Sequence, residues 1–449
     1  MLDTTRSLNI DLIRNAADPL TGSATDYDSL INLVGDARFV LLGEASHGTH
    51  DFYRERSKIT KRLICEKGFC AVAVEADWPD ALRVNRYVQG QTTDADAVEA
   101  LSGFKRFPEW MWRNADVLDF VGWLRSYNDS LSSDSSEKIG FYGLDLYSLH
   151  ASIQAVLQYL DETDPAGATR ARYRYACLDH FGENVQAYGY AAGFGLSENC
   201  ESAVVAQLIE LRSHAKDYIR KDGKIAMDNF FSAEQNARLI KNAERYYRTM
   251  FRQQFSSWNL RDEHMTDTLS ALISYLAIRQ KFPKVVVWAH NSHLGDARAT
   301  QMNRMGEWNV GQLVRQRYPG ECCLIGFTTH TGTVTAASNW DYPPQRKKIR
   351  PARPDSYEDL FHDTEIPAFV LPLKQGSPVA FGLTEPMLER AIGVVYRPES
   401  ELTSHYFEAR LAQQFDGVVH LDETRAVEPL EPMVEIPDKE PAETFPSGF

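Results

Sequence analysis

Acidic and histidine side chains follow four apolar segments of the sequence, and these residue types can carry out acid–base chemistry. They are Glu44, His47, Glu75, Asp77, Asp145, His290 and His293. A neutral imidazole can take a proton from water near pH 7, and a neighbouring carboxylate can stabilise the imidazolium that results. Burying such groups without a use would cost free energy. The sequence therefore predicts one shared polar site, provided that the fold brings the four segment ends together.

Glu44 and His47 are three residues apart, and Gly43 and Gly48 on either side permit a sharp turn of the chain. One interpretation is a general-base histidine that is oriented by the carboxylate. The alternative is a carboxylate that caps the start of a helix, beside a histidine whose hydrogen bonds are satisfied. The spacing alone leaves both interpretations open.

His290 and His293 form a second pair, directly after the apolar segment 285–289. The two imidazoles could bind a metal ion or polarise a substrate oxygen. As a metal motif the pair lacks the H-E-x-x-H spacing, and a zinc site usually needs a third protein ligand. Glu44, His47 or Glu75 could supply that ligand. The alternative is a pair of strand-end histidines that are hydrogen-bonded to backbone.

Arg54 lies in the first turn of the helix that is predicted after His47. Its guanidinium offers paired donors and could clamp a carboxylate or a carbonyl oxygen. A buried salt bridge between Arg54 and Glu75 is the structural alternative for both residues.

Arg261, Asp262 and His264 cluster at the start of a predicted long helix over 261–280. We predict that Arg261 contacts the substrate, as do Asp77 and Asp145 at the strand ends. Asp262 could instead interact only with the dipole of the helix.

Buried strands must position these side chains. The four apolar segments are 38–50, 71–77, 139–145 and 285–294, and further strands are predicted at 322–329 and 368–373. The four segments are apolar nearly throughout rather than alternating, which is typical of parallel strands buried on both faces. In open parallel sheets, ligands bind beyond the carboxyl ends of the strands. The ionisable residues lie at that end of each segment.

The pattern predicts an α/β fold with a central, mostly parallel sheet flanked by helices, and with a helical insertion or cap. Residues 1–147 form the first part of the catalytic core, 148–282 the helical insertion and 283–424 the second part of the core. Residues 425–449 contain five prolines and six acids, which predicts an extended tail.

Composition excludes several classes of protein. The 449 residues carry 48 Lys and Arg against 62 Asp and Glu, a net charge of −14, which argues against a broad nucleic-acid or anionic-membrane surface. No segment approaches the roughly 18 apolar residues of a membrane span, and the N-terminus does not resemble a signal peptide. The six cysteines form no C-x-x-C pair and are expected to be small buried residues in a reducing cytoplasm.

Common catalytic motifs are absent from the sequence. There is no G-x-S-x-G nucleophile elbow, no P-loop and no G-x-G-x-x-G, which disfavours the common serine hydrolases and nucleotide sites. The segment 339–356 is predicted to be a loop, either solvated or a lid over a polar substrate. Its basic residues are Arg346, Lys347, Lys348, Arg350 and Arg353. Aromatic residues of the insertion suit either a large apolar substrate or the core of the cap: Tyr173, Tyr175, Tyr188, Tyr190 and Phe194.

The sequence resembles the erythromycin esterase family over about residues 30–420. The matching segments are LLGEASHGTHDFYRERSKITKRLI, VAVEADWPDALRVNRYV, FYGLDLYSL, SWNLRDEHMTDTL, VVVWAHNSHLGDA and RPARPDSYEDLFH. The resemblance implies hydrolysis of a macrolide lactone or a related ester by water, without a covalent enzyme intermediate. By motif position it implies a general base at His47, its acidic neighbour at Glu44, the family's arginine at Arg54, the second-strand acid at Glu75 and the later histidines at His290 and His293.

We therefore predict a cytoplasmic hydrolase of a carboxylic ester or macrolide lactone. Its expected partner is a small-molecule ester or macrolide-like substrate, with no nucleic acid and no membrane, and its oligomeric state is not predicted. No cofactor is expected. Two alternatives stay open: a metal-dependent hydrolase that uses the Glu and His cluster with a divalent metal, and a non-enzymatic protein that binds a small molecule.

Overall fold

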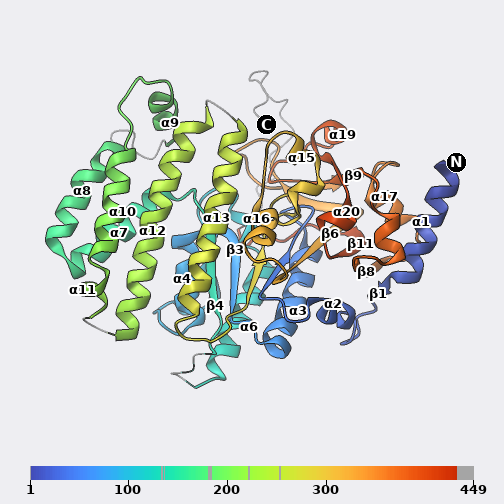
Figure 1. Cartoon of the computed structure of the whole chain (residues 1–449), viewed down its shortest axis with the longest axis horizontal. Coiled ribbons are helices and arrows are strands. Elements are labelled where there is room, and N and C mark those ends of the chain that lie inside the picture. The colour runs from blue at the N-terminus through green and yellow to red at the C-terminus, as the bar shows by residue number, and fades with distance from the viewer. Residues whose placement is uncertain are drawn as a thin grey trace.

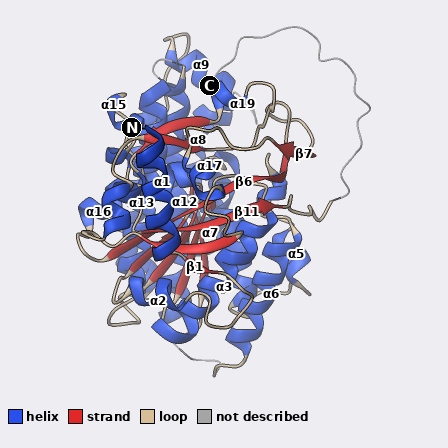
Figure 2. Ribbon diagram, turned by 90° about the vertical axis from the view of Figure 1, so that its right-hand side faces the viewer, coloured by secondary structure: helices blue, strands red, loops and turns tan. Residues whose placement is uncertain are grey.

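The computed structural model describes residues 2–431, apart from 133, 134, 136, 180–184, 221, 222, 252 and 253. A central sheet crosses the described chain, with helices on both of its faces (Figures 1 and 2). The strands are β1 (Asp18–Pro19), β2 (Phe39–Leu42), β3 (Ala71–Asp77), β4 (Gly140–Asp145), β5 (Val285–Trp288), β6 (Cys322–Ala336), β7 (Gln345–Ile349), β8 (Ala368–Pro372), β9 (Met387–Arg390), β10 (Tyr406–Ala409) and β11 (Gly417–Thr424).

The helices alternate with these strands in the first and last thirds of the chain. They are α1 (Leu2–Ala16), α2 (Asp28–Val34), α3 (His50–Lys67), α4 (Trp78–Val88), α5 (Ala97–Leu101), α6 (Ala115–Asp129), α7 (Leu149–Thr163), α8 (Pro165–Asp179), α9 (Val185–Gly193), α10 (Glu201–Ser213), α11 (Ala215–Ile219), α12 (Gly223–Met250), α13 (Gln254–Leu276), α14 (Asn291–Leu294), α15 (Gln301–Arg304), α16 (Val310–Arg317), α17 (Tyr357–His362), α18 (Pro378–Gly382), α19 (Glu401–Ser404) and α20 (Leu411–Gln414). Two short 3₁₀ helices cover Glu109–Met111 and Ala297–Ala299.

Six neighbouring strands of the main sheet are parallel, in the order β11-β6-β2-β5-β3-β4. Strands β8 and β1 extend the sheet antiparallel beyond β11, and β7 pairs antiparallel with β6. Strands β9 and β10 form a separate antiparallel pair. The predicted α/β class, with a mostly parallel central sheet flanked by helices, is confirmed.

The parallel strands are apolar throughout because both faces of the sheet are covered. In β2, Phe39 and Leu41 belong to one buried core cluster, whereas Val40 and Leu42 belong to the other. Helices α7, α12 and α13 contribute to the first cluster, and α2, α3 and α6 contribute to the second. Successive side chains of a strand point to opposite faces, so a strand between two cores needs no polar side.

Helix α3 connects β2 to β3, which run in the same direction in the sheet. It ends at Gly68, which adopts the left-handed conformation with φ 70° and terminates the helix without steric cost. However, β2 and β3 are not adjacent, because β5 lies between them. This insertion of a distant strand brings the segment after β5 next to the segment after β2.

Helices α7 to α13 occupy the chain between β4 and β5, in agreement with the predicted helical character of 148–282. They form the green and yellow half of Figure 1. Helix α13 packs against β4 and α16, and α12 packs against α4, so this region is in direct contact with the sheet and its helices. The domain boundaries themselves stay a prediction.

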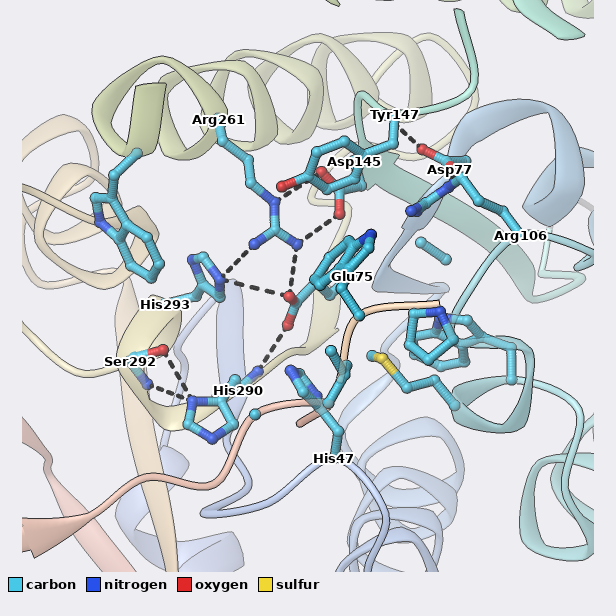
Figure 3. A pocket seen from close by; sticks show the side chains of 18 of the residues that line it. His47, Glu75, Asp77, Arg106, Asp145, Tyr147, Arg261, His290, Ser292 and His293 are labelled. Carbon is cyan, nitrogen blue, oxygen red and sulfur yellow. Dashed lines mark hydrogen bonds and ion pairs between the residues drawn. The ribbon is translucent and has the colours of Figure 1, made fainter. Parts of the chain in front are cut away.

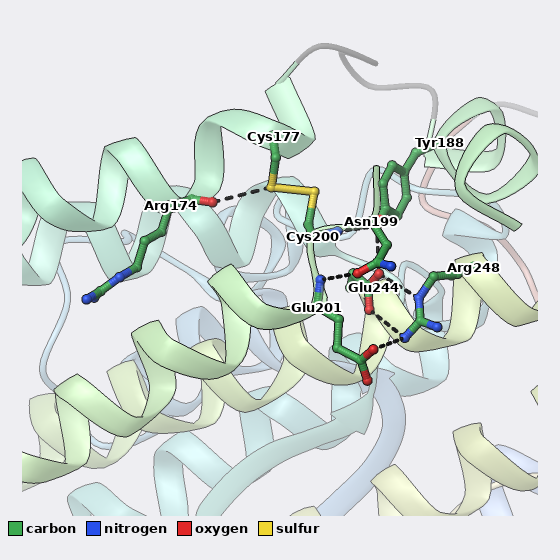
Figure 4. Close-up of a disulfide and its surroundings, with 8 residues drawn as sticks. All are labelled: Arg174, Cys177, Tyr188, Asn199, Cys200, Glu201, Glu244 and Arg248. Carbon is green, nitrogen blue, oxygen red and sulfur yellow. Dashed lines mark hydrogen bonds and ion pairs between the residues drawn. A yellow bond between two sulfur atoms is a disulfide. The ribbon is translucent and has the colours of Figure 1, made fainter. Parts of the chain in front are cut away.

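The cysteines differ from the expectation of small buried residues. Cys177 at the end of α8 forms a disulfide with Cys200, which directly precedes α10 (Figure 4). Cys177 and Cys65 are exposed, whereas Cys70, Cys200 and Cys323 are buried. The expectation is therefore wrong for Cys65 and for the bonded pair.

Two predicted irregular segments contain regular or packed structure. The prediction of a loop over 339–356 is wrong for Gln345–Ile349, which forms β7 beside β6 with alternating burial. Ala426 and Val427, in the segment predicted as a tail, are buried, and Ala426 bridges to Thr49. The rest of that prediction, from residue 432 onward, lies outside the described residues. Among the described helices, none is both long enough and apolar enough to cross a membrane.

Gly48 supports a close approach of backbone rather than an unusual turn. Neither Gly43 nor Gly48 is among the described glycines with positive φ. A Cβ atom on Gly48 would instead clash with the backbone carbonyl of Thr335, whose N–H donates to the Gly48 carbonyl at 3.0 Å.

We therefore expect Gly48→Ala to lower the free energy of unfolding by about 1–3 kcal/mol, because backbone atoms must move to admit the methyl group. Denaturant unfolding measures this change. Gly122→Ala is the matched control, since nothing lies within 4 Å of a Cβ atom there and alanine favours the helix. A Gly48→Ala protein as stable as the wild type would contradict the clash.

Candidate active site

A cavity of about 510 Å³ lies at the carboxyl edge of the sheet, where β2, β5, β3 and β4 end (Figure 3). Seven of the residues singled out in the sequence line it: His47, Glu75, Asp77, Asp145, Arg261, His290 and His293. Its aromatic lining comes from residues such as Trp112, Tyr147, Tyr246, Trp258 and Trp340. The fold thus brings the predicted ionisable groups together, while their individual roles stay predictions.

Glu44 orients the ring of His47, and Tyr53 anchors its backbone. Its Nδ1 lies 2.9 Å from Oε1 of Glu44, and the other oxygen of Glu44 accepts a hydrogen bond of 2.7 Å from Arg56. The hydroxyl of Tyr53 donates to the backbone carbonyl of His47 at 2.9 Å. With Nδ1–H donating to Glu44, a neutral His47 carries its lone pair on Nε2, as a general base requires.

Arg56 is fully buried and lies beneath this pair. Its guanidinium carbon is 4.5 Å from the centre of the Tyr53 ring and 5.0 Å from that of Trp288. Aromatic faces attract a cation, which offsets part of the cost of burying the guanidinium. Glu44 and Arg56 therefore form a buried ion pair that supports the ring of His47.

Glu75 is buried near the end of β3, at the base of the cavity. Its Oε1 accepts a hydrogen bond of 2.7 Å from Arg261 of α13 and lies 3.4 Å from Nε2 of His293. Its Oε2 accepts a hydrogen bond of 2.9 Å from the backbone N–H of His290. Burial alone would raise the pKa of Glu75, but the positive charges of His293 and Arg261 hold it below its usual value. Glu75 is therefore an anion that fixes the surrounding elements.

His293 lies between two carboxylates and an indole. Its Nδ1 is 2.9 Å from both oxygens of Asp262, and its ring stacks on Trp258 with 4.4 Å between centres. Burial lowers the pKa of His293, but Asp262 and Glu75 raise it overall. The Asp262 oxygen also accepts from the backbone N–H of Val310, which anchors α16 to the site. His293 is thus the histidine that is best placed to carry a positive charge.

His290 is the opposite case. Its Nδ1 accepts 3.2 Å from the backbone N–H of Ser292, so its neutral form carries the proton on Nε2. Burial, together with the nearby His47, lowers the pKa of His290 to about 3. The rings of His47 and His290 are 4.9 Å apart. A neutral imidazole with a fixed N–H can donate a hydrogen bond beside the general base.

A second group of charges lies on the β3–β4 side of the cavity. Asp77 accepts hydrogen bonds of 3.0 Å from Arg106 and 2.7 Å from the backbone N–H of Tyr147. Asp145 forms an ion pair with Arg261 at 2.6 Å. Burial raises the pKa of Asp77, and Asp145 adds to the rise. Burial alone would raise the pKa of Asp145, but Arg261, together with Arg106, lowers it overall. Both carboxylates line the cavity and are engaged with arginines, and their predicted contacts with substrate stay predictions.

Arg54 is not part of this arrangement. It pairs with Glu55 at 2.6 Å and with Asp51 at 2.9 Å on the outer side of α3, and it does not line the cavity. The predicted salt bridge between Arg54 and Glu75 is wrong, because Arg261 occupies that position. The position of Arg54 also gives no support to its predicted contact with a substrate oxygen.

Sequence reasoning missed Arg56 and misjudged Asp262. Arg56 is four residues after Phe52 and three before Ile59, so it lies in the apolar stripe of α3, where a charged residue indicates a buried partner. Helix α13 begins at Gln254 rather than near Arg261, so Asp262 lies two turns inside it and binds His293 instead of serving the helix dipole. His264 hydrogen-bonds to Asn242 at 2.8 Å, away from the cavity.

Two other predicted substrate contacts do not reach the cavity. None of the basic residues between 346 and 353 lines it, although Trp340 of the same segment does. Among the aromatic residues singled out in the cap, Tyr175 and Tyr188 are buried, whereas Tyr173, Tyr190 and Phe194 are exposed. None of the five lines the cavity.

The chain matches a known protein family over most of its length. The family described as erythromycin esterase matches residues 64–424. The chain belongs to the erythromycin esterase family. Erythromycin esterase type II of Escherichia coli is 23% identical over 326 residues, 69% of this chain and 73% of that protein. A Bacillus cereus crystal structure covers 95% of this chain and 99% of its own with a TM-score of 0.78 and 21% identity. A mutant of erythromycin esterase EreC in its open conformation covers 89% and 93% with a TM-score of 0.64 and 18% identity.

Membership of the erythromycin esterase family supports a hydrolase. The matched span includes Glu75, Asp145, Arg261, His290 and His293 but begins after Glu44 and His47. The placement of those two residues beside the rest of the site therefore comes from the geometry of this chain.

The contrast between Arg261 and Arg54 can be tested in this family member. We expect Arg261→Met to lower the free energy of unfolding by about 3–5 kcal/mol, because it leaves buried Glu75 and Asp145 without their cation. Arg54→Met is the matched control and should cost at most about 1 kcal/mol, since that ion pair is partly exposed. Urea unfolding compares the two variants, and equal losses would contradict the central place given to Arg261.

Asp80, which also lines the cavity, gives a pH dependence. Burial, followed by the negative charge of Asp77, raises the pKa of Asp80 from 3.8 to about 7. The folded state therefore binds more protons than the unfolded state between these values, and stability is lost as the pH rises through this window. We expect Asp80→Asn to be more stable than the wild type by about 0.5–2 kcal/mol at pH 8, and by less at pH 5.

Melting curves at both pH values measure this difference. Asp80→Glu keeps a carboxyl group and should keep the pH dependence of the wild type. An Asn variant whose advantage is the same at pH 5 and pH 8 would contradict the elevated pKa of Asp80.

Proposed function

We propose that this protein hydrolyses a carboxylic ester, with a macrolide lactone as the first substrate class to test. In this mechanism His47 activates water directly, without a covalent enzyme intermediate. The observation that carries the proposal is the oriented His47, whose Nδ1 is fixed by Glu44 at 2.9 Å while its ring faces the cavity.

Water activation rests on the chain from Arg56 through Glu44 to His47. The Nε2 lone pair of His47 takes a proton from water as the oxygen attacks the ester carbonyl. The imidazolium that forms is stabilised by the Glu44 carboxylate, which Arg56 holds in place through its 2.7 Å contact. The same proton then passes to the leaving alkoxide, so one ester and one water give one acid and one alcohol.

Stabilisation of the oxyanion falls to the two later histidines. His290 is neutral and carries a proton on Nε2, which is the donor. His293 contributes its positive charge rather than a free N–H, because its Nδ1 lies 2.9 Å from Asp262 and its Nε2 lies 3.0 Å from Arg261 and 3.4 Å from Glu75. Each fixed donor aimed at the developing negative charge lowers the activation free energy by on the order of 3–4 kcal/mol. Glu75 serves here as a positioning residue, because it binds the backbone of His290 and lies against His293.

The cavity suits a substrate larger than a simple acyl ester. Its volume of about 510 Å³ lies within the range of drug-sized sites, roughly 300–1,000 Å³. Trp112, Tyr147 and Trp340 supply apolar faces, while the ionisable groups are concentrated at its base. This combination favours a bulky, largely apolar molecule with one reactive carbonyl.

The metal-dependent alternative has less support from the geometry. Each carboxylate at the cavity base is engaged by a cation or a donor: Glu44 by Arg56, Glu75 by Arg261, and Asp262 by His293. Within the described residues, the cavity holds no group of three ligand atoms that lie within 4.8 Å of one another. A metal cation would also have to displace the guanidinium of Arg261.

The direct test is mass spectrometry of a 14-membered macrolide after incubation with the purified protein, with and without a chelator. We expect a gain of one water that survives chelation. Loss of the gain in the chelator arm would favour the metal-dependent alternative. Ligand-dependent melting without any gain of water would favour a binding protein.

The role of His47 has its own test. We expect His47→Ala to lower kcat by about 10²–10⁴-fold on any confirmed ester substrate, because the general base is lost. His50→Ala is the matched control, since His50 pairs with Asp116 and does not line the cavity. A His47→Ala protein that turns over at the wild-type rate would remove the assignment.

A further inference from the structure

A second histidine cluster lies at the neighbouring strands β6 and β11, away from the candidate active site at the ends of β2, β5, β3 and β4. His330 in the middle of β6, His362 at the end of α17 and Asp422 in β11 each offer a ligand atom, and these atoms lie within 4.8 Å of one another. Beside them is a separate cavity of about 260 Å³ that shares no lining residue with the first. We infer that this cluster binds a divalent transition-metal ion of the zinc type.

The sheet register brings two of these ligands together. Leu421 of β11 lies beside Thr329 of β6, so the next residues along, Asp422 and His330, are neighbours on parallel strands. Helix α17 packs over both strands and adds His362 from its last turn. The three side chains thus come from three elements that are far apart in the sequence, as in a built site rather than a local turn.

The free hydrogen-bonding capacity of the cluster points to a cation. Nδ1 of His330 is buried and has no hydrogen-bond partner among the described residues. The carboxylate of Asp422 lies 2.7 Å from Nδ1 of His362 and 3.6 Å from Nε2 of His420, and no arginine or lysine pairs with it in the described chain. Among the described residues, Asp422 therefore lacks the arginine partner that Glu44, Glu75, Asp77 and Asp145 have at the other site.

A supporting shell orients the carboxylate. His420 is fully buried, and its Nδ1 lies 2.9 Å from the hydroxyl of Thr328, which turns its other nitrogen toward Asp422. Ligands of metal sites are commonly fixed by such outer contacts. The small cavity is lined by His362 and Asp422, together with Asp363 and Glu365. Asp363 and Glu365 are paired with Arg6 and Arg14, so Asp422 is the carboxylate of this cavity without an arginine partner in the described chain.

The ligand types select the metal. Imidazole suits zinc, copper, iron and nickel, whereas magnesium and calcium prefer oxygen ligands alone. Zinc sites with three protein ligands keep a fourth position open, and here that position would face the cavity. The rings of His330 and His362 stack at 3.8 Å and are nearly parallel. An imidazole binds a metal in its own ring plane, so His362, whose side chain is 46% exposed, must tilt on binding.

The test uses the full-length protein after removal of metals by a chelator, followed by addition of Zn²⁺ and measurement of bound metal per chain. We expect one ion that is lost in His362→Ala and in the isosteric Asp422→Asn, and a Zn²⁺-dependent rise in melting temperature that both variants lack. With Co²⁺ in place of Zn²⁺, the wild type should show visible absorption bands that the two variants do not.

Two control variants test whether Zn²⁺ binds to histidines outside this cluster. His214→Ala removes a partly exposed histidine of the helical region, and His47→Ala removes one from the candidate active site. Both should keep the ion. The inference is overturned if the wild type takes up no Zn²⁺, if His362→Ala and Asp422→Asn bind as much as the wild type, or if the ion is lost in His47→Ala instead. None of these outcomes depends on the proposed esterase activity.

Discussion

Glu75 binds two separate elements at the carboxyl edge of the sheet and lies against a third, and the shape of the cavity depends on these contacts. From β3 it accepts hydrogen bonds from Arg261 of α13 and from the backbone that follows β5, and it lies beside His293 of α14. A buried carboxylate with this many favourable partners stays ionised, and its charge in turn keeps Arg261 in place. The constraint is electrostatic, and it joins the sheet to the helical region.

That constraint explains why the helices between β4 and β5 belong to the site and not only to its cover. Helix α13 contributes Arg261, Asp262 and Trp258, which respectively bind Glu75, His293 and the ring of His293. The sheet supplies the histidines because β5 is inserted between β2 and β3. The site therefore forms only when the strand order and the docking of α13 are both complete.

The sequence was sufficient for the strands and their ends, because segments buried on both faces are apolar throughout and acids or histidines mark where they stop. Partners across the fold were harder to predict. Arg54 and Arg56 are two residues apart, and only the helical phase of Arg56 with Phe52 and Ile59 distinguishes the buried one. The Arg261–Glu75 pair joins residues 186 positions apart, and no local pattern encodes such a contact. The strand β7 was missed because its exposed face is basic and polar, which resembles a loop.

Charge balance distinguishes the two histidine clusters of the molecule. At the cavity base, arginines neutralise the acids: Arg56 faces Glu44, Arg261 faces Glu75 and Asp145, and Arg106 faces Asp77. His47 is left to exchange a proton, which suits acid–base chemistry. Among the described residues, only the imidazoles of His362 and His420 lie within ion-pair distance of Asp422, and Arg6 is engaged by Asp359 and Asp363. Imidazole lone pairs and a carboxylate without a fixed cation are the conditions under which a metal ion gains most from binding.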